Sequence, residues 1–267
     1  MKKEAKPQEN NKMPLLIIGG VLVAAAIIGY WYYNSSRTPG GNANRAANAS
    51  NVNSNRSPSA TAPLGANPPN MIGSPTAAVT IEEFADFQCA ACASVHPILK
   101  EIQSIYGSRI RFIFRNFPLG IPQHDKAYEA AVAVEAAGLQ DRNKFWDMQN
   151  QLFVNQQAWT NSPNYRNLWE GYAQQIGLDV ERFRNDMAGR ATKERVDADL
   201  ARGRGLGLDS TPTVLVNGKN IPFQAMTAAN LRQVIDSEIQ NSLKAPAANS
   251  SNEANTSRNA AAPATAQ

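Results

Sequence analysis

The sequence contains two cysteines among its 267 residues, Cys89 and Cys92, and only two residues separate them. The residues at 79–87 form an apolar run typical of a strand, and those at 89–106 follow a helical period. At a helix start, this spacing puts both sulfur atoms on one turn, close enough to bond. Free N–H groups and the helix dipole there favour a thiolate at the first sulfur. We therefore interpret the two cysteines as a redox-active pair.

Two other interpretations of the cysteines are weaker. An inert structural disulfide between Cys89 and Cys92 would close a very small loop, so it would restrain the unfolded chain little. Together with His96 and His124, the cysteines have the composition of a zinc site. Their spacing is not that of a zinc finger, so we expect no metal, with His96 partly exposed on a helix and His124 capping the helical region that follows.

Composition and charge exclude several other classes. The chain has a net charge of +4 and a pI of about 9.1, but its basic residues are scattered. No Lys/Arg stretch with interleaved aromatic residues indicates a nucleic-acid surface, so we expect no nucleic-acid partner. Two cysteines are also too few for a disulfide-stapled scaffold.

An uncharged apolar segment at 13–33 follows a lysine-containing N-terminus at 1–12. As a helix, this segment would span roughly 30 Å, about the thickness of a membrane's hydrocarbon core. The preceding lysines favour a cytoplasmic N-terminus, and aromatic residues at the far end suit a membrane interface. We predict a single-pass anchor in the cell membrane. A cleaved signal peptide is the alternative, because small residues around 43–49 leave cleavage open.

Two segments have too few large apolar residues to order themselves. Residues 34–68 are rich in Asn, Ser, Ala, Pro and Gly, and residues 245–267 have a similar composition. We predict a disordered linker, with a reach on the order of 30 Å, and a disordered C-terminal tail.

Between these segments the pattern alternates strands and helices. A strand at 79–87, covered on both faces, precedes the cysteine helix, and Gly107 ends that helix. A second strand at 109–115 is expected to run parallel to the first strand. No convincing strand occurs at 124–206. Five helices are expected there, at 124–137, 142–156, 163–176, a short stretch after Asp179, and about 191–202. Gly138 is expected to stop the first of them, and Ser162 to be the N-cap of the third.

A short second half follows the helical block. Thr213–Val216 is a predicted strand, and Asn217-Gly218 is a type I′ hairpin signal that returns the chain through 219–223. Thr227 is expected to cap a final amphipathic helix. We therefore predict an α/β fold in which a helical block is inserted between strands.

With these motifs in this order, the sequence resembles the DsbA-like thiol–disulfide oxidoreductases of the thioredoxin superfamily over about 69–243. The residues that carry the resemblance are Phe84-x-x-Phe87-x-Cys89-x-x-Cys92, Arg115-Asn116-Phe117-Pro118-Leu119, Phe145-Trp146, and Ser210-Thr211-Pro212-Thr213 before Asn217-Gly218. The resemblance implies a thioredoxin fold with an inserted all-helical domain, here preceded by a transmembrane helix. Its parts would be a first half at 69–123, the insertion at 124–206 and a second half at 207–244.

The resemblance also implies an activity and partners. Such an enzyme acts on the extracytoplasmic (periplasmic) side and transfers its Cys89–Cys92 disulfide to secreted or envelope proteins through a mixed disulfide. It needs no cofactor, and a DsbB-like, quinone-linked membrane oxidase reoxidises it. No dimerisation domain is evident, so we expect a monomer.

Site roles follow from the same motifs. Cys89 is the expected nucleophile, and Cys92, one turn further on, should be more buried and have a higher pKa. In the family, a buried acid beneath the second cysteine occupies the position of Glu83, where it takes the proton of Cys92. Glu82 is an adjacent competitor, because strand alternation alone does not decide between them.

The cis-proline loop and the residues between the cysteines complete the expected site. By resemblance, Pro212 follows a cis bond, Thr211 presents its backbone to the substrate, and Ala90 and Ala91 also contact it. Many relatives carry a proline and a histidine at the two alanine positions. Alanine cannot donate to the Cys89 thiolate, so we expect a weaker oxidant than those relatives. A reductase or isomerase using the same cysteines, and a non-catalytic tethered peptide-binding module, are the alternative functions.

Overall fold

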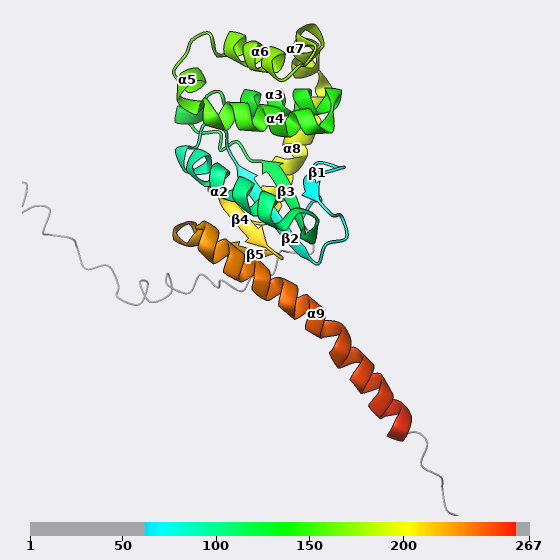
Figure 1. Cartoon of the computed structure of the whole chain (residues 1–267). Helices are drawn as coiled ribbons and strands as arrows, with labels where there is room; N and C mark the ends of the chain where they lie inside the picture. Colours follow the sequence, from blue (N-terminus) through cyan, green and yellow to red (C-terminus); the bar gives the residue numbers. More distant parts are fainter. Residues whose placement is uncertain (1–61, 260–267) are drawn as a thin grey trace, which may run out of the picture. The chain divides into compact units, whose positions relative to one another are not determined.

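The computed structural model describes residues 62–259, with side chains through Lys244. Its centre is a five-stranded sheet in the order β1-β3-β2-β4-β5 (Figure 1). The strands are β1 (Asn70–Gly73), β2 (Val79–Ala85), β3 (Ile110–Asn116), β4 (Thr213–Val216) and β5 (Lys219–Ile221). β2 and β3 are parallel, as predicted, and the other neighbouring pairs are antiparallel. The edge strand β1 was not predicted, because its four residues have no period-two alternation.

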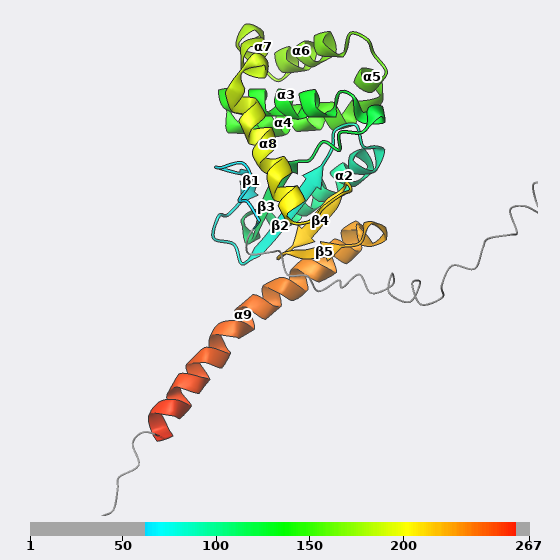
Figure 2. The same cartoon turned by 180° about the vertical axis from the view of Figure 1, so that it is seen from behind.

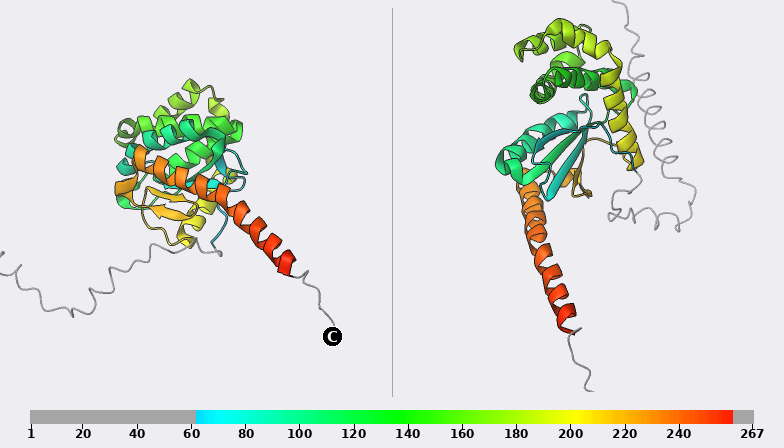
Figure 3. Two further views of the ribbon diagram at one scale, coloured as in Figure 1. Left: turned by 60° about the horizontal axis from the view of Figure 1, so that its bottom comes forward. Right: turned by 90° about the vertical axis from the view of Figure 1, so that its right-hand side faces the viewer.

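Helices cover both faces of the sheet. α2 (Ala90–Tyr106) lies on one face and α8 (Arg190–Gly205) on the other (Figure 3, right). On the α8 face, the Phe84 ring packs edge-on against Phe117 with centroids 6.0 Å apart. A Cβ on Gly203 would lie 2.4 Å from an atom of the Phe117 ring. The close approach of α8 to the sheet therefore requires glycine at this position.

The second half of the sheet ends in a hairpin and a long helix. Asn217 and Gly218 have φ values of 47° and 78°, which the predicted type I′ turn requires. α9 (Ala228–Asn259) follows, and Thr227 Oγ1 accepts a hydrogen bond from Asn230 N at 3.3 Å, as an N-cap does. α9 continues beyond residue 244, where the apolar pattern predicts its end. This extension enters the segment predicted to be a disordered tail; its alanines favour helix, whereas Pro246 and its asparagines do not.

The inserted domain lies beyond one end of the sheet (Figure 2). Its helices are α3 (Ala127–Gln140), α4 (Arg142–Val154), α5 (Gln156–Thr160), α6 (Tyr165–Gln175) and α7 (Val180–Ala188), and α8 leads back to the sheet. Short 3-10 helices elsewhere are η1 (Gly107–Arg109), η2 (Pro122–His124) and η3 (Phe223–Ala225).

Several predicted helix boundaries in this domain are wrong. α3 begins at Ala127 and not at 124, and the helix expected at 142–156 ends at Val154, before the separate α5. α3 passes through Gly138, which was expected to stop it, because the glycine lets α4 pack closely: a Cβ there would lie 3.2 Å from Phe145 Cβ. The N-cap position of α6 is Asn164 and not Ser162, and the Asn164 side chain makes no capping hydrogen bond. The Ser162 hydroxyl instead accepts a hydrogen bond from Asn164 N at 3.0 Å, which forms a turn before the helix begins.

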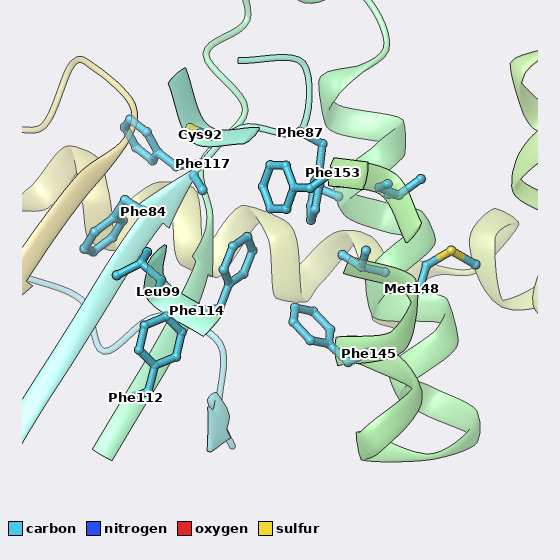
Figure 4. Packing of buried hydrophobic residues seen from close by; sticks show 14 of the residues in the cluster. Phe84, Phe87, Cys92, Leu99, Phe112, Phe114, Phe117, Phe145, Met148 and Phe153 are labelled. Atoms are coloured by element: carbon cyan, nitrogen blue, oxygen red, sulfur yellow. The ribbon is translucent and has the colours of Figure 1, made fainter. Parts of the chain in front are cut away.

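Aromatic side chains join the insertion to the sheet in one core (Figure 4). Phe153 of α4 stacks on Phe87 with centroids 4.7 Å apart, and Phe145 packs against Phe114 of β3 at 5.8 Å. Phe87 precedes Cys89 by two residues. The insertion therefore packs directly against the segment that leads to the cysteines.

A buried ion network lies on the α8 face. Arg115 Nε donates to Glu82 at 2.7 Å, and its Nη1 donates to Asp199 at 2.9 Å. Arg202 binds both oxygens of Glu82, at 2.6 and 2.7 Å. These arginines lower the pKa of Glu82 against the opposing effect of burial. Glu82 is therefore held as a carboxylate inside the fold.

The same network holds the chain that precedes β1. Arg115 Nη1 donates to Ala66 O at 3.1 Å and its Nη2 to Leu64 O at 3.0 Å, while Asp199 accepts from Ala66 N at 2.8 Å. Gly65, at φ 82°, allows this contact, because a Cβ there would lie 2.5 Å from Arg115 Nη1. Residues 64–66 are thus fixed to the sheet by buried charges.

The predicted anchor at 13–33 lies outside the described residues. Within 62–259, no helix combines the length and the apolar character needed to cross a membrane.

We expect Arg115→Met to destabilise the domain by about 3–5 kcal/mol, because it leaves the buried charges of Glu82 and Asp199 without this partner. Urea denaturation measures the change in the free energy of unfolding. Lys219→Met is the control: its ion pair with Glu238 is largely exposed on the lysine side, so its loss should cost less than about 1 kcal/mol. Equal losses in the two variants would contradict the structural role of the network.

Candidate redox site

The two cysteines lie at the start of α2, as predicted. Cys89 is the N-cap residue of the helix, and Cys92 lies in its first turn. Both are free thiols in the structure. Cys89 retains 9% of its surface exposed and Cys92 none. Only the first sulfur is therefore available to a protein substrate.

The environment of Cys89 stabilises its thiolate. Its pKa is lowered from the ordinary 9.0 to about 5, mainly by the hydrogen bond from the Cys92 thiol, while burial opposes the shift. The Thr211 side chain and the backbone N–H groups of Cys92 and Ala91 contribute further. At neutral pH the reduced site therefore holds a nucleophilic thiolate.

Thr211 contacts Cys89 in a way that depends on protonation. The protonated thiol donates to Thr211 O at 3.4 Å. Thr211 Oγ1 is buried and has no hydrogen-bond partner among the described residues. Its hydrogen is therefore free to turn toward the sulfur when Cys89 ionises, consistent with the lowered pKa of Cys89.

Cys92 has the opposite environment. Burial, followed by the neighbouring Cys89 sulfur, raises the pKa of Cys92 well above its usual value. The pair therefore holds one thiolate and one thiol. This is the asymmetry that a nucleophilic cysteine and its partner need.

The two adjacent glutamates lie on opposite faces of β2. Phe84 and Glu82 face α8, where Glu82 is paired with arginines. Strand alternation directs Glu83 to the α2 face, the side of Cys92. Glu83 is 1% exposed, and its Oε1 has no hydrogen-bond partner among the described residues. Burial raises its pKa from 4.5 to about 8. Of the two glutamates, only Glu83 has the environment expected of the buried acid.

The cis-proline loop lies beside the first cysteine. The Thr211–Pro212 peptide bond is cis, as the resemblance implies, and the contact between Cys89 Sγ and Thr211 O brings the loop to the sulfur. Ala90 is exposed and Ala91 is half-buried, so both are within reach of a substrate bound at Cys89.

Asp86 is a site residue that the sequence analysis missed. It is buried, and its Oδ1 accepts from Gln88 N at 2.7 Å while its Oδ2 accepts from Leu119 N at 2.9 Å. Asp86 Oδ2 also lies 2.8 Å from His124 Nδ1. The bond to Gln88 is a local Asx turn, a pattern readable from sequence; the contacts with the loop at 119–124 are not.

The histidines differ from expectation. His124 pairs with Asp86 beside the redox turn and does not cap α3, whose N-cap is Lys126. His96 is buried and not partly exposed, because its ring stacks on Phe153 at 4.9 Å and its Nε2 lies 3.3 Å from Asn150 Oδ1. In the part of the chain that the structure describes, no group of three or more potential metal-ligating side chains occurs.

Gln156 is the second residue that the sequence analysis missed. Its side-chain Nε2 donates to Phe87 O at 2.7 Å and to Cys89 O at 3.0 Å. The partners are separated by 69 and 67 residues, and no local signal in the sequence predicts such contacts.

Among curated relatives, the Na(+)/H(+) antiporter NhaA 1 of Mycolicibacterium gilvum is 37% identical to this chain over 149 residues. The alignment covers 55% of this chain and 23% of the antiporter. The chain thus spans about a quarter of the length of the curated antiporters that it matches, and most of each antiporter has no counterpart in the alignment.

Solved structures share the fold. BdbD from Bacillus subtilis, in its oxidised form, has a TM-score of 0.55 and 22% identity, covering 67% of this chain and 98% of BdbD. α-DsbA1 from Wolbachia pipientis has a TM-score of 0.57 and 18% identity, covering 70% and 98% respectively. These likenesses support the thioredoxin fold with a helical insertion.

The match to a family model is more extensive. Residues 66–237 match the model described as Thioredoxin (Thioredoxin_4). The matched range includes the redox turn, the helical insertion and the cis-proline loop, so it covers every element of the site described above. The chain therefore belongs to this thioredoxin family.

Proposed function

We propose that this protein is an extracytoplasmic thiol–disulfide oxidoreductase, tethered to the cell membrane through its N-terminal segment, that donates disulfides to secreted or envelope proteins. The observation that carries the proposal is the asymmetry of the pair: the pKa of Cys89, at the N-terminal end of α2, is about 5, and that of Cys92, which has no exposed surface, is raised. The uncharged segment at 13–33 supports the tether.

Disulfide donation proceeds in two exchanges. A substrate thiolate attacks Cys89 Sγ in the oxidised pair, forms a mixed disulfide and releases Cys92 as a thiolate. A second substrate thiolate then attacks the substrate sulfur of that mixed disulfide and releases Cys89 as a thiolate. The substrate is oxidised by two electrons and the pair is reduced. A membrane oxidase of the quinone-linked, DsbB-like class would accept these electrons.

Glu83 is suited to donate a proton to Cys92 and to accept it back. With a pKa of about 8, its carboxyl is largely protonated at neutral pH. It can give a proton to the Cys92 thiolate as that sulfur leaves, and take it back when Cys92 attacks. The apolar surroundings keep this proton from exchanging freely with solvent.

The site favours the oxidase direction. A stabilised Cys89 thiolate lowers the free energy of the reduced pair, which makes the disulfide more ready to be given away. The stabilising groups are Cys92, Thr211 and backbone N–H groups, without the histidine that many relatives carry. We therefore expect an oxidant weaker than those relatives.

Cys89→Ser should abolish the oxidation of a dithiol peptide, because it removes the sulfur that forms the mixed disulfide. With a disulfide-bonded peptide, Cys92→Ser should instead accumulate a covalent Cys89–substrate adduct, visible by non-reducing gel electrophoresis, because the Cys89 thiolate attacks the substrate disulfide and no Cys92 thiol remains to resolve the mixed disulfide. Retention of peptide binding in Cys89→Ser separates the loss of chemistry from the loss of the fold. Unchanged physiological activity of Cys89→Ser would favour the non-catalytic binding module.

The reduction potential of the Cys89–Cys92 pair should be less oxidising than that of Pro-His relatives, because Ala90 and Ala91 offer no side-chain donor to the thiolate. Equilibration with glutathione redox buffers measures it. A value as oxidising as that of the relatives contradicts this expectation. A pair found reduced in cells would support a reductase in place of an oxidase.

Glu83→Gln should slow the steps that move the Cys92 proton by roughly tenfold to a hundredfold, because it removes the proton carrier. It should also change the pH dependence of stability. A folded pKa raised from 4.5 to about 8 means that the wild type loses stability as pH rises across this window, by at most about 1.4 kcal/mol per pH unit. Gln at this position should remove that loss.

Glu82→Gln is the matched control for this prediction. The pKa of Glu82 is lowered by its arginine partners against burial, so the wild-type carboxylate stabilises the fold above its unfolded pKa. That stabilisation is lost as pH falls through the lower folded pKa. Glu82→Gln should therefore destabilise the protein at neutral pH. If both variants showed the same pH dependence, the assignment of the acid to Glu83 would fail.

A further inference from the structure

The corner between α4 and α5 contacts the redox turn through one polar side chain. Gln156, the first residue of α5, is 9% exposed and donates from Nε2 to the carbonyl oxygens of Phe87 and Cys89. Carbonyls are acceptors only, so the NH₂ group of the amide must face them. The orientation of the side chain is thus determined by its partners.

The corner itself is rigidly held. Trp159 of α5 is fully buried, and its Nε1 donates to Leu152 O at 2.8 Å, which fixes α5 onto α4. Phe153 of α4 stacks on Phe87 of the redox turn. Gln156 therefore extends from a fixed support and is not a mobile surface side chain.

The two acceptors belong to the turn that orients the site. Cys89 O accepts the first hydrogen bond of α2, from Ala93 N at 3.2 Å, in addition to that of Gln156. The peptide plane of this carbonyl sets the direction in which the helix starts. The N–H groups of Ala91 and Cys92, which lower the pKa of Cys89, belong to the free donors of that first turn. Holding Cys89 O in place keeps them directed at the sulfur.

Redox chemistry at this turn requires such a support. The charge and covalent partner of Cys89 Sγ change at each step of the proposed exchange, whereas the backbone donors must remain in position to stabilise the thiolate each time it forms. Asp86 holds the turn through Gln88 and the loop at 119–124. Gln156 holds it from the inserted domain.

We propose that Gln156 is a positioning residue of the redox site, through which the inserted helical domain fixes the start of α2 and maintains the thiolate of Cys89. The proposal rests on the proposed function, since it takes the cysteine pair as the reacting centre. It gives the insertion a role in setting the reactivity of the pair, in addition to covering the site.

Gln156→Met tests this role, because it keeps the length of the side chain and removes both N–H donors. The ultraviolet absorbance of the thiolate, followed against pH in the reduced full-length protein, gives the pKa of Cys89. We expect a rise of about one unit, a tenfold decrease in the acid dissociation constant, from its value of about 5. The reduction potential should become less oxidising in parallel.

Gln149→Met is the matched control. Gln149 is a buried glutamine of α4 that lines a cavity with Trp146 and Asn150, so its replacement reproduces the general cost of changing a buried glutamine in the insertion. We expect it to leave the pKa of Cys89 unchanged. An equal shift in Gln149→Met and Gln156→Met would overturn the proposal, because it would indicate a general loosening of the domain.

Gln156→Ala provides a second test if the methionine variant does not fold. It removes both N–H donors and introduces no new charge or larger side chain into the corner. The pKa of Cys89 should then rise by a similar amount. A wild-type pKa in a folded Gln156 variant would overturn the proposal. The pKa of Cys89 is measured without a substrate, so this test is independent of the proposed function. The proposed function would fail in a separate experiment, in which the wild-type protein did not oxidise a dithiol peptide.

Discussion

The site depends on one helix turn that gives two sulfur atoms different environments. Cys89 lies at the end of α2, where backbone donors are free, and Cys92 lies one turn inside, where no solvent reaches it. The hydrogen bond from the Cys92 thiol is the largest cause of the low pKa of Cys89. Burial is the largest cause of the raised pKa of Cys92, and the contact with Cys89 raises it further. The contact between the two sulfurs therefore separates the two pKa values beyond what burial does. The surrounding structure serves to hold this contact.

Strand β2 likewise gives two neighbouring glutamates different environments and opposite pKa shifts. Glu82 and Glu83 are adjacent and both buried, yet the pKa of one is lowered and that of the other raised. Since successive side chains of a strand point to opposite faces, Glu82 meets Arg115 and Arg202, and Glu83 meets apolar surface. The arginines are confined to the α8 face. An uncompensated acid can therefore persist on the α2 face of the sheet, at a cost that the rest of the core must offset.

Local patterns in the sequence predicted the parts of the fold that local physics determines. The doubly apolar run at 79–87, the helical stripe after it and the Asn217-Gly218 turn each lie where they were expected. The prediction for Gly138 was wrong because this glycine serves tertiary packing: it leaves room for Phe145 of α4 and does not end α3. Of the site, the spacing predicted the cysteine pair, and the family resemblance implied the cis-proline loop and the buried acid at Glu83. Asp86, His124 and Gln156 act through contacts between distant segments, which spacing does not encode.

The buried ion network also determines where the segment that precedes β1 attaches to the sheet. Residues 64–66 bind Arg115 and Asp199, and Asp199 also accepts from Asn116 N. In the parallel register Arg115 and Asn116 pair with Phe84 and Ala85, at the strand ends that lead to Cys89. The attachment therefore lies at the redox end of the sheet but on its α8 face. The segment at 64–66 is therefore held by this network, while the redox turn is held separately by Asp86 and Gln156.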